Sequence, residues 1–278
     1  MSLLAFTAAL WLGSVAAGLL GALTGLGGGV VIVPLLILMF RVDVHYAIGA
    51  SLVSVIATSS GAAAAYVREG YSNIRVGMFL EMATTLGALS GATLATHVPP
   101  SGLAIVFGFV LMYSAYLSGH RAADPPTDLA PDRLATALRL DSSYPTANGP
   151  RAYHVRRIPM GFGLMYAAGI LSGLLGIGSG ALKVIAMDQG MCLPFKVSTT
   201  TSNFMIGVTA AASAGIYLHR GYIDPGLAMP VVLGVLPGSM LGARVFAVTR
   251  SQWLRRIFVW VIVALALEML YKGVTGNL

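Results

Sequence analysis

The sequence predicts an all-α polytopic membrane protein with two inverted-topology repeats, each holding a Gly-broken re-entrant or short helix pair plus three full transmembrane helices. A low charge content is the first observation behind this prediction. Of the 278 residues, 56% are hydrophobic and 10% are charged, whereas a typical soluble domain carries about 25% charged residues. Several windows of about 20 residues hold almost no charge, which is long enough for a helix to cross a hydrocarbon core of ~30 Å.

An internal repeat is the second observation. An offset of 151 residues superposes the two halves without a gap, so that YVREGY at 66–71 falls on YLHRGY at 217–222. Three glycines of each half also coincide at this offset: Gly25, Gly27 and Gly29 fall on Gly176, Gly178 and Gly180. Such self-similarity at one register indicates a duplicated unit.

The apolar segments of the two units define the expected domains. The first transmembrane repeat (1–119) has apolar segments at 3–24, 30–40, 47–67, 75–96 and 102–118, and the second (158–278) has them at 158–175, 181–191, 197–218, 226–248 and 254–271. The first segment lacks the basic start of a secretory signal, so we expect it to be retained. Residues 120–157 are rich in Pro, Asp and Arg and form a connecting loop, with a short helix expected near 133–140.

The distribution of basic residues is the third observation. The connecting loop holds six arginines, so the positive-inside rule places it in the cytoplasm and the chain in the cell (inner) membrane as a multi-pass protein. Counting segments away from this loop puts the turn at Gly70 inside and its counterpart at Gly221 outside. The repeats are therefore expected to be inverted. The same loops account for most of the net charge of +7, and no nucleic-acid partner is expected.

One apolar segment in each unit is short. Residues 30–40 would form a helix about 16 Å long, near half the membrane thickness. The preceding glycine stretch, GLGGG at 25–29, either caps a re-entrant hairpin, leaving three crossings per unit, or joins two crossing arms, giving five. Both numbers are odd, so a tandem duplication inverts the second unit in either case.

The two glycine-rich breaks are the predicted binding site. Unwound backbone at membrane depth must be buried in protein or line a wet cavity, and the helix start after each break offers free N–H groups that suit an anion. The expected backbone contacts are Gly27, Gly28 and Gly29 in the first break and Gly178, Ser179 and Gly180 in the second. The alternative is that glycines pack helices closely, and we favour this for Gly87, Gly91, Gly238 and Gly242.

Few polar residues lie within the apolar segments. Lys183 follows Ser179 by four residues on the same helix face, and an intramembrane charge is usually functional; the alternative is that Lys183 reaches the membrane surface. The stretch STTTSN at 198–203 lies at the repeat position of Ser51. Substrate contacts are predicted for Ser51, Thr201, Ser202 and Asn203, although such side chains also bond their own helix backbone. Glu81 either relays a proton or pairs with a cation.

The glycine motifs resemble those of a known family. GLLGALTGLGGGVVIVPLLI, AIGASL, GLLGIGSGALKV and TTTSNF are similar to motifs of the TauE/SafE sulfite exporter family, over roughly residues 10–120 and 160–270. The resemblance implies export of sulfite, sulfoacetate or related organosulfonates. Two features depart from the family pattern. Ile185 stands at the repeat position of Pro34, where a second proline is expected. The chain has a single cysteine, Cys192, so it does not match relatives that use paired cysteines.

We therefore expect a membrane transporter that exports a small sulfur-containing oxyanion by alternating access at a central site. The expected partners are this anionic substrate and the lipid bilayer. The sequence is compatible with a homodimer as well as with a monomer. No cofactor and no metal are expected, because no His, Cys and acidic residues show metal-ligand spacing. An intramembrane enzyme is disfavoured because no nucleophile and base are paired. A channel or transporter for another small anion, or a cation-coupled importer, is the alternative.

Overall fold

The computed structural model describes residues 3–24, 28–68, 70–119, 132–146, 149–248 and 252–276. The first half contains α1 (Leu3–Thr24), α2 (Gly29–Phe40), α3 (Val44–Arg68), α4 (Ile74–Ala95) and α5 (Pro100–Gly119). The second half contains α7 (Ile158–Leu175), α8 (Gly180–Ile185), the π-helix η1 (Ala186–Gly190), α9 (Phe195–His219), α10 (Pro225–Val248) and α11 (Gln252–Thr275). At an offset of 151 residues, both ends of α3 coincide with those of α9. The duplication therefore extends to the helices themselves.

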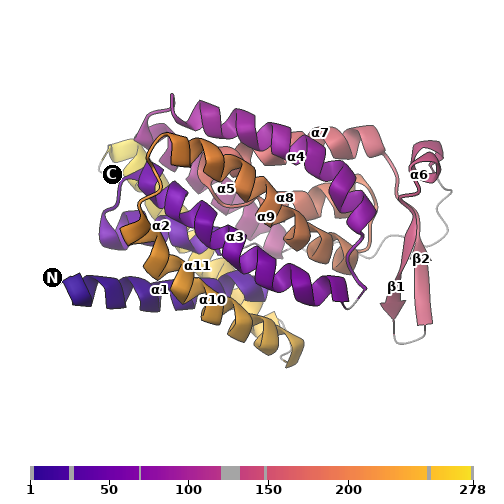
Figure 1. The fold of residues 1–278 in the computed structure, drawn as a ribbon, viewed down its shortest axis with the longest axis horizontal. Coiled ribbons are helices and arrows are strands. Elements are labelled where there is room, and N and C mark those ends of the chain that lie inside the picture. Colours follow the sequence, from indigo (N-terminus) through magenta and orange to yellow (C-terminus); the bar gives the residue numbers. More distant parts are fainter. Residues whose placement is uncertain are drawn as a thin grey trace.

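The connecting loop is folded within its described residues, 132–146 and 149–157. It contains α6 (Arg133–Ala137) and an antiparallel hairpin of β1 (Ser142–Thr146) and β2 (Gly149–Tyr153), which project from one end of the helical bundle (Figure 1). The predicted short helix is confirmed, whereas the hairpin was not predicted and makes the chain not purely α-helical. We call the end that carries the hairpin the connector end and the opposite end the far end.

Two helix pairs join the halves side by side. α1 packs along α10, and α4 packs along α7, which are equivalent pairs under the repeat. A Cβ atom added at Gly87 or Gly91 would overlap backbone oxygens of α7, and one at Gly238 would overlap the Val15 oxygen of α1. The predicted packing role of these three glycines is confirmed. Gly242 is also buried, on α10.

Two further pairs bring equivalent helices together in opposite directions. Gly49, near the start of α3, meets Tyr222, just beyond the end of α9, while Asn73, beyond the end of α3, bonds Thr201 near the start of α9. α5 and α11 pack in the same antiparallel manner, since Gly108 meets Leu270. Each of these helices is thus antiparallel to its own repeat counterpart.

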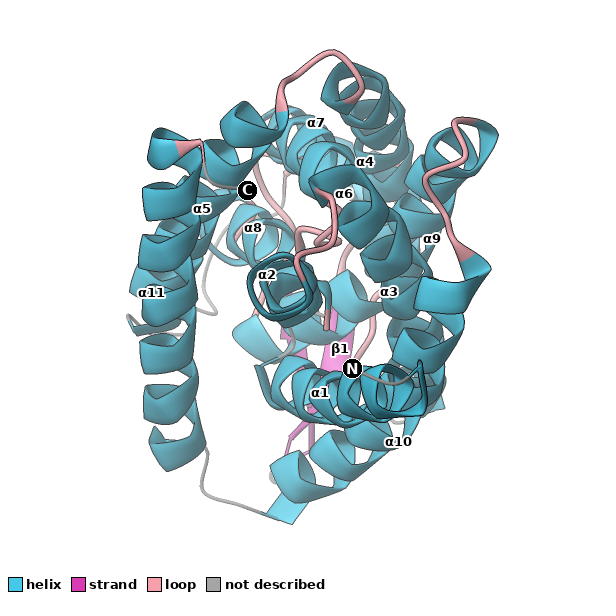
Figure 2. Ribbon diagram, turned by 90° about the vertical axis from the view of Figure 1, so that its left-hand side faces the viewer, coloured by secondary structure: helices cyan, strands magenta, loops and turns pink. Residues whose placement is uncertain are grey.

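The short helices lie in the middle of the bundle. In Figure 2, α2 and α8 are surrounded by the longer helices. α1 and α2 form a hairpin, because Phe6 near the start of α1 stacks edge-on against Phe40 at the end of α2, with ring centroids 5.3 Å apart. The second half repeats this hairpin at the opposite end of the bundle, where Gly161 of α7 meets Met191 beyond η1.

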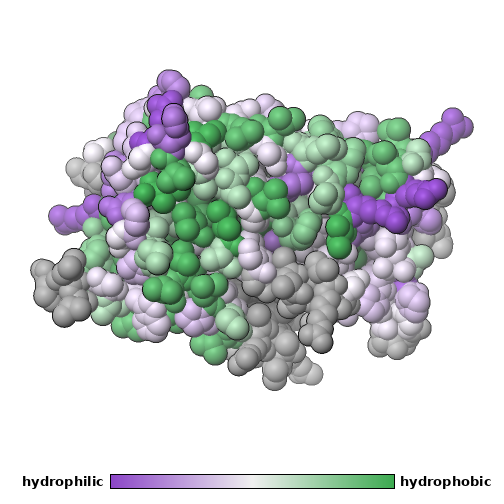
Figure 3. Space-filling model, viewed as in Figure 1, coloured by the Kyte–Doolittle hydropathy of each residue, from purple (hydrophilic) through white to green (hydrophobic). Residues whose placement is uncertain are grey.

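The outer surface of the bundle is apolar. Figure 3 shows hydrophobic side chains across its middle and hydrophilic ones toward the two ends. Within the part of the chain that the structure describes, three helical stretches are long and apolar enough to cross a membrane: Ile74–Ala95, Ile158–Leu175 and Pro225–Gly242. Large exposed side chains such as Phe109, Trp260 and Leu267 suit contact with lipid. This architecture is that of an α-helical multi-pass membrane protein.

Candidate functional site

The two glycine-rich breaks meet in the centre of the bundle. Ser51 Oγ of α3 donates a hydrogen bond to the Gly176 oxygen at 2.8 Å. A Cβ atom at Gly29, the first residue of α2, would lie 2.7 Å from Ser51 Oγ and 2.9 Å from the Gly176 oxygen. Close approach of these segments therefore requires glycine at position 29. Gly28 is buried beside it, while Gly27 lies outside the described residues.

The second break has an unusual backbone. Gly176, Gly178 and Ser179 have φ values of 67°, 70° and 47°, in the left-handed region that glycine adopts readily and a residue with a Cβ atom seldom does. Ser179 is therefore strained, and residues held in this region cluster at binding sites. Its Oγ atom is buried and has no hydrogen-bond partner among the described residues.

The helix after the second break is irregular. α8 spans six residues and continues as the π-helix η1, so the predicted segment at 181–191 is confirmed with a change of helix type. Ser202 Oγ of α9 donates to the Gly180 oxygen at 3.1 Å, which ties α9 to the start of α8. π-helical turns often occur at functional sites.

Lys183 of α8 is the centre of a buried polar cluster. Its side chain is 0% exposed, and its Nζ donates to Thr209 Oγ1 of α9. Thr209 Oγ1 is in turn 2.6 Å from Glu81 Oε1 of α4, and Glu81 Oε2 lies 4.0 Å from Lys183 Nζ. Lys183 therefore does not reach the membrane surface, and Glu81 pairs with a cation. We call Lys183, Thr209 and Glu81 the charge cluster; it combines both halves of the chain.

The charge cluster leaves hydrogen-bonding capacity unused. A lysine ammonium has three donors, but among the described residues Lys183 Nζ finds one acceptor, Thr209 Oγ1. Glu81 Oε2 has no partner there either. An unsatisfied buried polar group costs about 1–3 kcal/mol, and more when it is charged. The arrangement is thus suited to a ligand that accepts hydrogen bonds from Lys183.

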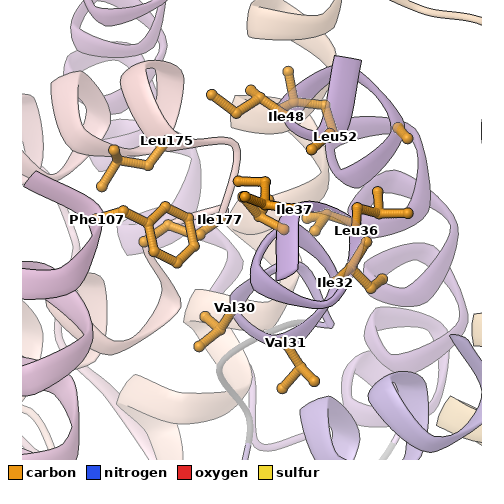
Figure 4. Close-up of a cluster of buried hydrophobic side chains, with 14 of the residues drawn as sticks. Val30, Val31, Ile32, Leu36, Ile37, Ile48, Leu52, Phe107, Leu175 and Ile177 are labelled. Carbon is orange, nitrogen blue, oxygen red and sulfur yellow. The ribbon is translucent and has the colours of Figure 1, made fainter. Parts of the chain in front are cut away.

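The offset of 151 residues does not generate a second copy of the charge cluster. The positions that correspond to Lys183 and Glu81 are Ile32 and Val232. Figure 4 shows that α2 is enclosed by apolar side chains from several elements, including Ile177 of the second break, in one buried cluster. Gly29 of the first break thus meets Gly176 of the second, but the polar groups gather around α8 rather than symmetrically around both helix starts.

Comparison with known proteins identifies the family. The family described as sulfite exporter TauE/SafE matches residues 10–269. The chain belongs to the TauE/SafE family. It is 26% identical over 265 residues to "Probable membrane transporter protein YunE" of Bacillus subtilis (strain 168), covering 93% of this chain and 95% of the relative.

Other relatives point the same way. "Probable membrane transporter protein YdhB" of Bacillus subtilis (strain 168) is 27% identical, over 82% of this chain and 85% of its own. "Probable membrane transporter protein" of Xylella fastidiosa (strain 9a5c) is 24% identical, over 92% and 93% of the two chains. No solved structure gives a significant match. This TauE/SafE chain is thus a membrane transporter and not an enzyme.

The remaining predicted residues of this TauE/SafE transporter lie on α9, where one of them has a structural partner. Thr201 Oγ1 accepts from the backbone N–H of Asn73 at 3.0 Å, and Asn203 is buried nearby on the same helix. The Asn73 side chain donates to the Leu140 oxygen at 2.9 Å and to Tyr153 Oη at 2.8 Å, which anchors the connector to both repeats. Burial raises the pKa of the Tyr153 hydroxyl, so this contact stays uncharged.

Two functional features escaped the sequence analysis. Thr209 lies seven residues after Ser202 and therefore on the same helix face, a spacing that could have revealed it. The second feature is a pair of equivalent contacts between the halves, one at each end of the bundle, which we call the end latches. Lys196 Nζ lies 5.8 Å from the Tyr71 ring centroid, and His45, at the repeat position of Lys196, stacks on Tyr222 at 4.9 Å.

Proposed function

We propose that this TauE/SafE transporter exports a small sulfur-containing oxyanion, such as sulfite, sulfoacetate or a related organosulfonate, which binds Lys183 between the two repeats. The observation that carries the proposal is the fully buried ammonium of Lys183, which donates to one acceptor among the described residues. Glu81 is its counter-charge in this conformation, at 4.0 Å, and the oxygens of a sulfonate would supply a negative charge together with acceptors for the remaining donors. The family name supports sulfur oxyanions as the substrate class.

Alternating access by two inverted-topology repeats is the mechanism we propose. The antiparallel packing of α3 against α9 supports it, because a helix and its repeat counterpart then point in opposite directions. The hairpin of α1 and α2, with Phe6 beside Phe40, brings both of its ends to one end of the bundle. With 12 residues, α2 is too short to cross a hydrocarbon core of ~30 Å, which supports a re-entrant pair and three crossings per repeat. Inverted repeats with interrupted helices at matching positions are typical of transporters that bind substrate near the bilayer centre.

The proposed orientation places the connector end in the cytoplasm. Residues 1–119 and 158–278 are then the two transmembrane repeats, and residues 120–157 are a cytoplasmic connecting loop. The arginines of the connector support this orientation, because basic loops remain on the cytoplasmic side. A potential that is negative inside favours export by about 2.3 kcal/mol per 100 mV for each net negative charge that crosses.

The proposed substrate contacts fall into two groups: residues next to Lys183 in the second break, and wall residues, several of which already bond protein atoms. Ser179 adds a buried hydroxyl one turn before Lys183. Gly178 and Gly180 flank it, and in this conformation Gly178 packs against Ile206 while the Gly180 oxygen accepts from Ser202. Gly28, Gly29, Ser51, Ser202, Thr201 and Asn203 shape the walls, since Ser51, Ser202 and Thr201 already bond protein atoms in this conformation.

Efflux from proteoliposomes loaded with sulfite or organosulfonates tests the proposal. Lys183→Ala is expected to abolish efflux, because the anion loses its counter-charge. This variant also leaves Glu81 buried and unpaired, so the double variant Lys183→Met/Glu81→Leu is the folding control: replacing both members of a buried pair by hydrophobic residues of similar volume is often neutral.

A double variant that folds but does not transport supports the proposal, and unchanged efflux from Lys183→Ala overturns it. A requirement for sodium, or sustained single-channel current, would favour a cation-coupled importer or a channel instead.

A further inference from the structure

We propose that Glu81 is a proton-binding site that couples proton movement to anion transport: its carboxylate neutralises Lys183 in the empty protein, and it binds one proton when the substrate anion takes its place on Lys183. The inference rests on the proposed function for the anion site. It adds a coupling ion, the residue that carries it and a stoichiometry of one proton per anion.

The two carboxylate oxygens of Glu81 have different surroundings. Oε1 is 2.6 Å from Thr209 Oγ1 and also receives the Thr85 hydroxyl at 3.4 Å. Oε2 has no hydrogen-bond partner among the described residues and faces Lys183 Nζ at 4.0 Å, beyond hydrogen-bond length. Oε2 can therefore take up a proton without losing an existing hydrogen bond. The Thr209 hydroxyl can remain on Oε1 in both states.

The charge balance of the site requires this proton. In the empty protein, Lys183 and Glu81 carry opposite charges and the buried cluster is neutral. A monovalent anion on Lys183 would leave one net negative charge in a region where Lys183 is 0% exposed, and uncompensated buried charge is strongly unfavourable. One proton on Glu81 restores neutrality. Anion and proton are then bound together and released together.

No other described ionisable group is placed to play this part. The helices packed against α4 are α7 and α9. Their ionisable side chains meet other partners or lie toward the helix ends: Tyr166 meets Ser90, Tyr217 donates to the Gly173 oxygen, Lys196 lies over Tyr71, and His219 ends α9. Arg75, on α4 itself, bonds the Arg139 oxygen at the connector end. Asp188 lies on η1 and already has an interaction partner.

The step changes no covalent bond in the substrate. The carboxylate takes one proton from the aqueous phase on the side where the anion enters, Lys183 keeps its three protons, and the proton leaves with the anion on the other side. For a monovalent sulfonate no net charge crosses the membrane. For a divalent anion one negative charge crosses with each turnover.

Parallel measurement of anion flux and proton flux in proteoliposomes tests the inference. Methanesulfonate is the monovalent probe and a trapped pH dye reports protons. The wild-type protein is expected to move one proton with each methanesulfonate, whether or not the membrane potential is clamped. In Glu81→Gln, which cannot change its charge, the proton flux that accompanies the anion is expected to disappear, and anion flux is expected to become sensitive to the potential.

Glu268→Gln is the matched control, because it makes the same chemical change at an exposed residue of α11 outside the charge cluster. It is expected to keep the wild-type ratio of protons to anions. A Glu81→Gln variant that still moves protons with methanesulfonate overturns the inference. So does a wild-type protein that carries methanesulfonate without protons, an outcome that leaves the proposed function intact.

Two further arms keep the test decisive. If the vesicles carry nitrate or acetate but no sulfur oxyanion, the proposed substrate class is wrong, while the proton ratio is still measured on the anion that is carried. If Glu81→Gln does not fold, proton uptake is measured on the wild-type protein in weakly buffered detergent solution as methanesulfonate is added. One proton per bound anion is expected, and no uptake overturns the inference.

Discussion

The Thr209 hydroxyl stands between two buried charges, since Lys183 donates to it and Glu81 Oε1 lies 2.6 Å away. Thr209→Val removes this bridge and leaves Lys183 without its one acceptor among the described residues. Because a lost hydrogen bond to a buried charged group costs more than a neutral one, we expect a loss of about 2–3 kcal/mol in the free energy of unfolding. Thermal unfolding of the purified protein in detergent measures it.

Thr58→Val provides the comparison for that measurement. Among the described residues its hydroxyl bonds the Val55 oxygen alone, 3.1 Å away in the same helix, so we expect a loss of about 1 kcal/mol or less. Equal destabilisation by the two variants would contradict the bridging role of Thr209.

At the residue scale, some features of the site follow from the sequence and others do not. Lys183 and Glu81 attract attention because charges are rare in apolar segments, and the paired breaks stand out because glycines recur at one offset. The sequence does not predict that Lys183 and Glu81 form an ion pair, because about 100 residues separate them. They meet because helix packing brings α4 and α8 near each other. Thr209 and Asn73 escape notice because hydroxyl and amide side chains are common in helices and turns.

The end latches lead to a prediction for the helices that they join. Tyr71→Ala removes the contact with Lys196 at the connector end, and Tyr222→Ala removes the stack on His45 at the far end. Lys196 is exposed, and a cation–aromatic contact at an exposed site is worth about 0.5–1 kcal/mol, while a stacked aromatic pair is worth about 0.5–1.5 kcal/mol. Each variant should therefore favour opening at its own end by roughly two- to tenfold.

A reporter cysteine in the second break measures which end opens. In a protein with Cys192, the single native cysteine, changed to Ser, Ser179→Cys is expected to react faster with an impermeant thiol reagent from the connector side when Tyr71 is Ala. It should react faster from the far side when Tyr222 is Ala. Faster reaction from the same side in both variants would contradict the equivalence of the latches.

At the scale of elements, the sequence predicts nearly all of the fold. The segments at 3–24 and 158–175 match α1 and α7 at both ends, because hydropathy and glycine punctuation agree there. The hairpin of β1 and β2 was missed, because its strands, SSYPT and GPRAY, have little β-propensity. They are held by cross-strand pairing and by the contact between Tyr144 and Tyr153. The π-helix η1 was missed for a similar reason, since composition does not distinguish it from an α-helix.

The two-repeat arrangement as a whole can be tested by labelling. Ile74 and Pro225 are equivalent first residues of α4 and α10, and both are exposed. With Cys192 changed to Ser, Pro225→Cys is expected to react with an impermeant maleimide in intact cells. Ile74→Cys is expected to react only after the membrane is opened, because inverted repeats place equivalent positions on opposite sides.

A cysteine at Arg151, exposed on β2, is the reference for the cytoplasmic side and should behave like Ile74→Cys. Labelling of both Ile74→Cys and Pro225→Cys in intact cells would be incompatible with inverted repeats.

The charge cluster also bears on the resting state of the empty protein. Under the proposed alternating access, two halves with identical side chains would make the inward-open and outward-open shapes equivalent by a two-fold rotation and equally populated without a membrane potential. Here Ile32 occupies the position that corresponds to Lys183, so we expect the two shapes to solvate the ion pair unequally. The empty transporter is then expected to favour one of the two shapes.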